Sequence, residues 1–423
     1  MRQLEVLLFM LIGGTTWGTT LGQDAPAARR PAIIEEMGPK EIVYITADQV
    51  TIPCRASGIP TPTYKWTHDG KPLNLGSRHV KMSSDDGTLT FDPIMTLDEG
   101  YYQCIVKNQY GQDISDLTLL RRAVLGRIPP RAPTLYSGNE GQPLILQCAD
   151  VRSYPPPEFS WSVGEDEHDA IGVALNERIQ IDENGNLYFA YLTKADMRNG
   201  HIYFCNVYNS KLYFTARVSN SKIQVKPGSL VNKVPSLMYS TPSKVIALRG
   251  QNEVRFKCFF SGIPAPGVSW VRVGGALPAG RYALEASNTE LVIKYVHETD
   301  QGMYQCTANN VEGTSSTKFT LDVQSKPEFV RGLRPTNINA PEKDQAEFNC
   351  KTEAEPPANV QWYINGEPVD NWNPGPCRAF SKDGTRFTIS DLDGQSDEMV
   401  VQCNASNVHG YQFASGYLNV ITL

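Results

Sequence analysis

The stretch Asp98-Glu99-Gly100-Tyr101-Tyr102-Gln103-Cys104 decides the fold, together with its near copy Asp300-Gln301-Gly302-Met303-Tyr304-Gln305-Cys306. Each stretch places a tyrosine two residues before a cysteine and an aspartate–glycine step just before the tyrosine. Such self-similarity indicates an internal repeat. The chain has 423 residues, enough for three or four domains of about 100 residues.

The cysteines extend this repeat to four units. With Cys377 left out, they pair in order at separations of 50, 57, 48 and 53 residues: Cys54 with Cys104, Cys148 with Cys205, Cys258 with Cys306, and Cys350 with Cys403. A tryptophan follows the first cysteine of each pair by 12 or 13 residues: Trp66, Trp161, Trp270 and Trp362. A disulfide between two facing sheets, with a tryptophan packed against it, is the core of the immunoglobulin sandwich. We therefore predict an all-β chain of four tandem immunoglobulin-like domains of the I-set type.

Two further residues recur in phase with the cysteines. The tyrosine of the corner between strands E and F is present in three units, as Tyr102, Tyr203 and Tyr304. The fourth unit has Val401 there, which predicts a corner held by packing alone. An asparagine stands four residues after each second cysteine: Asn108, Asn209, Asn310 and Asn407.

The spacing between units predicts the domain limits. We expect a signal peptide at 1–22, domains at 31–122, 126–226, 235–324 and 327–421, and a longer linker at 227–234. The middle connection between cysteine pairs has 53 residues where the other two have 44, an extra reach of up to about 30 Å. It would let the first two domains fold back on the last two as a horseshoe. The alternative is a loose string of four beads.

Composition and the chain ends exclude several function classes. A net charge of −6 gives no electrostatic footprint for nucleic acid. The apolar run from Leu4 to Ile12 is typical of a signal peptide. No later stretch reaches the roughly 20 apolar residues of a membrane helix, and the last residues, 420–423, add none. We expect a secreted or extracellular product, either in its own right or as the ectodomain part or secreted isoform of a membrane protein.

Few residues predict a chemical site. The six histidines are scattered over the four repeats, so we expect no catalytic site, metal site or cofactor. The acidic loop Glu165–Asp169 is better read as a solvated turn than as a calcium site, because its spacing matches no calcium loop. Cys377 has no partner left, which favours a free thiol over a cross-link between molecules.

Two surface features are candidates for modification or binding. The sequon Asn404-Ala405-Ser406 predicts N-glycosylation of Asn404, since a residue next to an inward-facing cysteine on a strand should point outward. Four arginines near the link between the first two domains could bind the phosphates of bacterial lipids or sulfated glycans; the alternative is a solvated linker. They are Arg121, Arg122, Arg127 and Arg131.

The run from Cys403 to Tyr411 and the run from Trp362 to Val369 resemble the L1/neuroglian adhesion molecules, and the four-domain architecture is similar to insect hemolin. The resemblance implies a horseshoe and adhesion, homophilic or to other immunoglobulin-superfamily surface proteins, of the kind used in axon guidance. For a hemolin-like chain it implies innate immunity instead, through binding of bacterial surface lipids and blood cells. We expect the adhesion function, with the immune function as the alternative.

Overall fold

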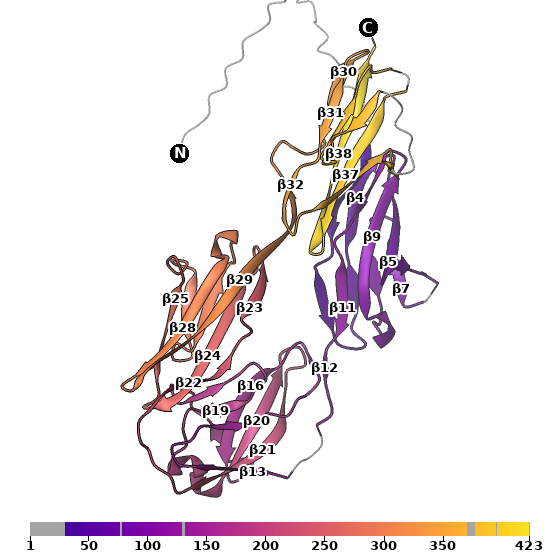
Figure 1. The fold of residues 1–423 in the computed structure, drawn as a ribbon. Coiled ribbons are helices and arrows are strands. Elements are labelled where there is room, and N and C mark those ends of the chain that lie inside the picture. The colour runs from indigo at the N-terminus through magenta and orange to yellow at the C-terminus, as the bar shows by residue number, and fades with distance from the viewer. Residues whose placement is uncertain (1–29, 77, 129–131, 370–376, 395, 423) are drawn as a thin grey trace, which may run out of the picture.

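The computed structural model describes residues 30–76, 78–128, 132–369, 377–394 and 396–422; the predicted signal peptide lies outside them. The described chain forms four β-sandwiches, here called D1 to D4 in chain order. Figure 1 shows the chain folded back, with D1 beside D4 at one end and D2 beside D3 at the other. The fold class is the one that the cysteine repeat predicts, and the horseshoe is the arrangement that the long middle linker predicts.

One sheet of D1 has the strand order β2-β11-β9-β5-β6, with β10 paired to β9. The facing sheet has the order β3-β8-β7, and β1 pairs with β4 at the side. Strand β2 runs parallel to β11 and closes the sandwich edge. The elements are β1 (Arg30–Met37), β2 (Glu41–Tyr44), β3 (Val50–Ile52), β4 (Cys54–Ile59), β5 (Thr63–His68), β6 (Lys71–Pro72), β7 (Val80–Met82), β8 (Leu89–Phe91), η1 (Thr96–Asp98), β9 (Gly100–Asn108), β10 (Gly111–Ile114) and β11 (Thr118–Arg122).

D2 repeats this plan with the order β13-β21-β20-β16-β17 facing β14-β19-β18. Its parallel strand β13 pairs only with the second half of β21. The elements are β12 (Val124–Leu125), β13 (Thr134–Asn139), β14 (Leu144–Leu146), β15 (Ser153–Tyr154), β16 (Glu158–Gly164), β17 (Ile171–Gly172), β18 (Ile179–Ile181), β19 (Leu187–Phe189), η2 (Lys194–Gly200), β20 (Ile202–Asn209) and β21 (Phe214–Lys226).

D3 and D4 are joined by one continuous strand, β29, which pairs with β28 and β23 in D3 and with β32 in D4. The D3 elements are β22 (Lys233–Ser240), β23 (Lys244–Leu248), β24 (Glu253–Ile263), β25 (Gly267–Arg272), β26 (Tyr282–Glu285), β27 (Glu290–Lys294), η3 (Glu298–Asp300), β28 (Gly302–Asn310) and β29 (Gly313–Phe329). The D4 elements are β30 (Ile338–Pro341), β31 (Ala346–Asn349), β32 (Thr352–Glu355), β33 (Asn359–Ile364), β34 (Glu367–Pro368), β35 (Arg378–Phe380), β36 (Arg386–Ile389), β37 (Met399–Asn407) and β38 (Gly410–Ile421).

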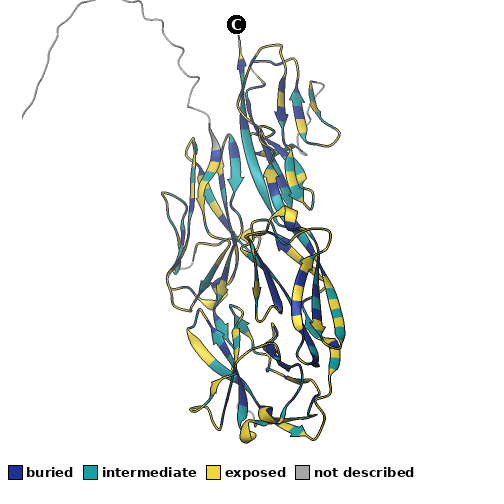
Figure 2. Ribbon diagram, turned by 90° about the vertical axis from the view of Figure 1, so that its left-hand side faces the viewer, coloured by how far each residue is buried: buried dark blue, intermediate teal, exposed yellow. Residues whose placement is uncertain are grey.

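Each sandwich has its own core, which the two-residue period of its strands builds. In β8, for example, Leu89 and Phe91 are fully buried on the inward face. The ring N–H of each core tryptophan donates to a backbone carbonyl across the sandwich, at 2.7 to 2.8 Å, on Gly87, Gly185, Asn288 and Gly384 respectively. Figure 2 shows the buried residues inside each sandwich and the exposed residues on hairpins and outer strands.

The corner between strands E and F lies between β8 and β9 in D1, β19 and β20 in D2, β27 and β28 in D3, and β36 and β37 in D4. A tyrosine hydroxyl bonds to this corner in D1, D2 and D3, and D4 has a valine in place of the tyrosine. The hydroxyls of Tyr102, Tyr203 and Tyr304 donate to the carbonyls of Asp98, Asp196 and Asp300 at 2.7 to 3.0 Å. In D4 the expectation of packing alone is wrong. Asp397 accepts the backbone N–H of Asp393 at 2.9 Å and forms an ion pair with Arg378, while Val401 fills the core.

The linker between D2 and D3 lies back against D2. Its residues 227–232 connect β21 to β22. A side chain at Gly228 or Gly141 would collide with the backbone of Glu140 or Ser229, at 2.3 and 2.1 Å from the added Cβ. The Nζ of Lys233, at the end of the linker, donates to the carbonyl of Gly141 at 2.7 Å. These glycines let the linker turn tightly enough to bring D3 beside D2.

Candidate functional site: the two interdomain contacts

The contact between D2 and D3 is an aromatic cluster. Tyr188 on β19 and Phe259 on β24 are 7% and 4% exposed, and their rings lie 6.0 Å apart, edge to face. Tyr239 on β22 lies 5.7 Å from Tyr188. Burial raises the pKa of Tyr239 to about 12. Phe259 faces away from the D3 core because the inward residues of this strand are Cys258 and Phe260.

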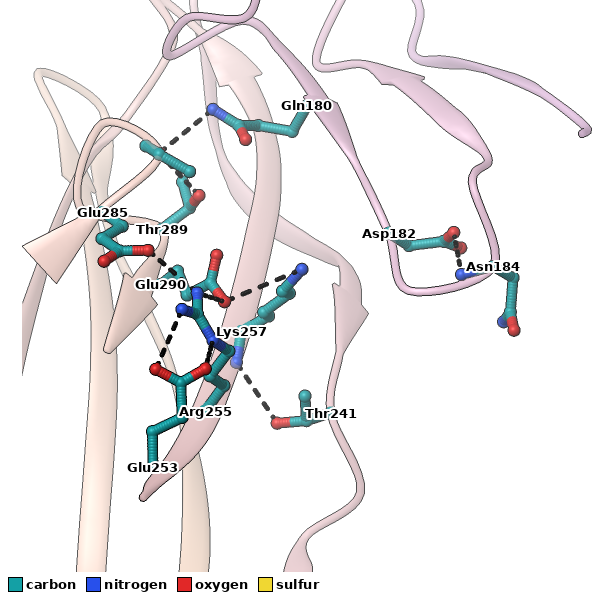
Figure 3. A network of polar contacts seen from close by, with 11 residues as sticks. Gln180, Asp182, Asn184, Thr241, Glu253, Arg255, Lys257, Glu285, Thr289 and Glu290 are labelled. Atoms are coloured by element: carbon teal, nitrogen blue, oxygen red, sulfur yellow. Dashed lines mark hydrogen bonds and ion pairs between the residues drawn. The ribbon is translucent and has the colours of Figure 1, made fainter. Parts of the chain in front are cut away.

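A polar network flanks the aromatic cluster (Figure 3). Gln180 of D2 donates from Nε2 to the carbonyl of Ala286 in D3, at 3.1 Å. Beside it, Arg255 on β24 contacts three glutamates at 2.7 to 3.0 Å: Glu253, Glu285 and Glu290. Hydrogen bonding to these carboxylates raises the pKa of Arg255, first through Glu253. These ion pairs fix the Arg255 side chain within D3, next to the face that D2 covers.

The contact between D1 and D4 is polar at its centre. Gln402 on β37 has no exposed surface. Its Oε1 accepts the backbone N–H of Gln112 on β10 at 3.1 Å, and its Nε2 donates to the carbonyl of the same residue at 2.7 Å. One side chain therefore satisfies both backbone groups of Gln112, as a neighbouring strand would.

Three further polar pairs surround this centre. Gln103 donates from Nε2 to the hydroxyl of Tyr411 at 3.0 Å, and burial raises the pKa of that tyrosine. Lys107 and Glu367 form an ion pair at 2.9 Å, with side chains 45% and 72% exposed. Lys326 and Asp116 lie 3.8 Å apart.

Two glycines permit a close backbone approach beside the ion pair. Gly366, in the turn between β33 and β34, has φ of +80°, and a Cβ built there would lie 3.4 Å from the Cα of Gly111. The D1 hairpin and the D4 turn therefore meet with almost no side chain between them.

The hairpin between β20 and β21 of D2 is exposed, unlike the faces that the two interdomain contacts cover. Tyr213 and Phe214 are 82% and 57% exposed. Beside them, a cleft of about 830 Å³ runs along the first half of β21 and is lined by Leu125, Leu212 and Ala216 among others. Exposed aromatic side chains next to a partly unpaired strand are typical of a protein-binding surface.

The structure places the predicted core residues together in each domain. The four cysteine pairs form disulfides with Cα–Cα distances of 5.7 to 6.6 Å, and all four tryptophans are buried. Cys377, at the start of β35, is exposed and outside any disulfide. Asn404 points outward from its sandwich, but on the face of D4 that D1 approaches.

The structure separates the first two arginines of the predicted patch. Arg121 stacks on the ring of Tyr154 in D2, 3.8 Å from its centre. Arg122, the next residue of β11, projects to the opposite side of the strand, and Arg127 follows β12 in the chain. Arg131 lies outside the described residues. The acidic loop folds on itself, since Asp169 accepts the backbone N–H groups of Glu165 and Asp166 at 3.2 and 2.9 Å.

Two properties of the described residues bear on other functions. They contain no group of three or more His, Cys, Asp or Glu side chains that could hold a metal ion. No helix in this part of the chain is both long enough and apolar enough to span a membrane.

The residues of both interdomain contacts escaped the sequence analysis. Gln402, Tyr411, Tyr188 and Phe259 look like ordinary outward residues of strands. A weak signal exists for the first of them, because glutamine stands immediately before the second cysteine in D1, D3 and D4, as Gln103, Gln305 and Gln402. Two of these three glutamines form the D1–D4 contact.

Comparison with known families identifies D1, D3 and D4. Residues 33–120 and 238–323 match the immunoglobulin I-set domain, and residues 326–407 match an immunoglobulin domain family. Among curated proteins, neurofascin from Gallus gallus is 30% identical over 417 residues, which is 93% of this chain and 30% of neurofascin. Neuroglian from Drosophila melanogaster is 28% identical over 434 residues, 99% of this chain and 33% of neuroglian. The chain thus spans about a third of the length of these relatives.

Among solved structures, the insect immune protein hemolin aligns over 93% of this chain and all of its own, with a TM-score of 0.69 and 23% identity. The hemolin structure was described as a domain arrangement with implications for homophilic adhesion. At this identity the likeness shows the fold.

Proposed function

This chain belongs to the immunoglobulin superfamily, with relatives among the L1-type adhesion molecules, and we propose that it is an extracellular, non-catalytic recognition protein that mediates cell adhesion through contacts between immunoglobulin domains. Four disulfides support an oxidising extracellular location. The observation that carries the proposal is the folded-back chain, whose D1–D4 and D2–D3 pairs leave their outer faces and the D2 hairpin free for a partner.

The finer proposal is homophilic contact, in which the D2 hairpin and its cleft bind a second copy of the chain. Tyr213 and Phe214 supply the aromatic surface that anchors protein interfaces. Within the described residues the first half of β21 pairs only with β20, so its other edge has no strand partner there and could accept a further strand.

Bead clumping tests this function. Beads coated with the protein should clump, and F214S should reduce clumping by at least several-fold. V311S is the matched control, because Val311 is 76% exposed in the corresponding hairpin of D3. Beads that neither clump nor bind cells bearing related adhesion molecules would sink the adhesion proposal. Clumping unaffected by F214S would reject this contact surface and leave adhesion standing.

The hemolin-like immune function was expected from the four-domain architecture, with the arginine patch as its lipid-binding site. Among the described residues, Arg121 and Arg122 project to opposite sides of β11 and so do not supply one shared surface for a lipid phosphate.

A further inference from the structure

The sequon at Asn404 lies on a strand whose outward face is covered by another domain. In β37, Cys403 and Ala405 are fully buried in the D4 core. Asn404 therefore shares the opposite face with Gln402 and Ser406. On this strand, a side chain that points outward from D4 points toward D1, because Gln402 on the same face is completely buried against Gln112 of D1.

Contacts with D1 lie on both sides of Asn404 along this face. Gln402, which binds Gln112, is two residues away, about 7 Å along the strand. In the other direction, Ser406 pairs with Tyr411, whose hydroxyl accepts the hydrogen bond from Gln103. The direct cross-strand neighbour of Asn404 is Phe413, whose ring packs 5.6 Å from that of Tyr363.

The side chain of Asn404 is itself poorly accommodated in the closed arrangement. Its Oδ1 is buried and has no hydrogen-bond partner. A buried amide oxygen without a partner costs about 1–3 kcal/mol. The closed structure thus leaves a buried, unsatisfied oxygen next to the amide nitrogen that an N-glycan would modify.

From this placement we propose that Asn404 is an N-glycosylation site whose occupancy decides whether D1 closes on D4. The Asn404 amide nitrogen forms a bond to the anomeric carbon of a lipid-linked oligosaccharide, the bond from that carbon to the lipid diphosphate breaks, and the nitrogen gives up one proton. The transfer takes place on the extended chain before D4 folds.

A glycan at this position and the closed contact exclude each other. The Gln112–Gln402 hydrogen bonds of 2.7 and 3.1 Å hold the two faces together two residues from Asn404, so a sugar ring on Asn404 would push between faces that are already in contact. The molecule with the glycan keeps D1 and D4 apart, and the molecule without it closes. The aromatic D2–D3 contact, on the far side of the horseshoe, is the same in both.

The test compares one glycan at two places on D4. The full-length protein is secreted from cultured cells as wild type, as S406A, and as S406A/D383N. S406A removes the natural sequon. D383N creates a sequon with Thr385 in the exposed turn before β36, so the double variant carries an equal glycan away from D1. Intact mass and peptide mapping give occupancy, and small-angle X-ray scattering gives the shape.

Wild type is expected to carry a glycan on Asn404 and to have a larger radius of gyration than both variants, which should be closed. A glycan found on Asn404 in a molecule as compact as S406A would overturn the proposal, and so would wild type secreted without any glycan there. Neither readout uses adhesion, so this proposal and the proposed function can fail separately.

Discussion

The two interdomain contacts of the horseshoe are built from opposite chemistry. D2 meets D3 through Tyr188, Phe259 and Tyr239, which exclude water, whereas D1 meets D4 through Gln112, Gln402 and an exposed ion pair. Burial of aromatic surface is worth a few kcal/mol per side chain, while a polar contact gives little net free energy because water competes for it. The base of the horseshoe is therefore the fixed part, and its tips form a contact that can open.

Removing the aromatic anchor should have the largest effect. F259A deletes a ring that is 4% exposed and faces D2 rather than the D3 core. We expect a loss of about 3 kcal/mol in the free energy of unfolding, together with separation of D2 from D3. Denaturant unfolding and small-angle scattering measure the two effects. V271A is the control, since Val271 is 52% exposed on β25 and should cost less than about 0.5 kcal/mol. Equal losses in both variants would mean that the cluster does not hold the base together.

In protein without the Asn404 glycan, produced as S406A, removing the central glutamine of the other contact should open the tips and leave the base intact. Q402A deprives the N–H and carbonyl of Gln112 of their partner, a loss of about 1–3 kcal/mol in the closed state. Energy transfer between a dye on the exposed thiol of Cys377 and a second dye on D1, at K71C, should fall.

The matched control for that experiment is Q305A. Gln305 occupies the same position before the second cysteine of D3, but its Nε2 donates only to Thr307 within its own domain. Energy transfer should be unchanged in Q305A. An equal decrease in both variants would show that the glutamine matters for folding of the domain rather than for closure.

The contrast between the contacts also explains what the sequence could predict. Each core is specified within about 50 residues by a repeated Cys, Trp and Tyr pattern. The pattern predicts the core because every domain packs two sheets around a disulfide and a tryptophan. The recurring asparagine has a role that the pattern alone could not give. Its Nδ2 donates across the domain to a carbonyl in the bend between strands B and C, at 2.8 to 3.1 Å: Pro60 for Asn108, Tyr154 for Asn209, Pro264 for Asn310 and Pro356 for Asn407.

The interdomain contacts could not be predicted in this way. Asn404 was expected to point outward from its strand, but only the folded-back chain shows that another domain lies on that side, and no expectation was made for Gln402. The corner of D4 was misjudged for a different reason. Its ion pair joins Asp397 to Arg378, 19 residues apart. The pairs Arg178–Asp196 in D2 and Arg281–Asp300 in D3 repeat it, so the sequence held a recurring pair beside the tyrosine that the expectation for this corner did not use.

The polar contact should also respond to pH more than the aromatic one. Burial raises the pKa of Asp113, next to Gln112, to about 6, although the backbone N–H groups of Ile34 and Ile114 lower it. The folded state then binds a proton more tightly than the unfolded chain. The stability from this group is present at low pH and is lost as the pH rises through about 6. From pH 7 to pH 5, wild type should gain stability relative to D113N, on the order of 1 kcal/mol because the residue is only partly buried.

Denaturant titrations of both proteins at several pH values measure this difference. D85N is the control for removal of one carboxylate at an exposed loop position. A difference between wild type and D113N that stays constant from pH 7 to pH 5 would contradict the assignment.

The exposed ion pair at the tips should contribute least. Lys107 and Glu367 lie 2.9 Å apart with much of both side chains in solvent, where such pairs are worth about 0–1 kcal/mol and are screened by salt. In the S406A protein, which lacks the Asn404 glycan, K107E should reduce closure slightly at low salt, and the reversed pair K107E/E367K should restore it. Energy transfer between D1 and D4, measured at low and high salt, tests both statements. A K107E effect as large as that of Q402A, or one that salt does not weaken, would mean that charge rather than the glutamine contact holds the tips together.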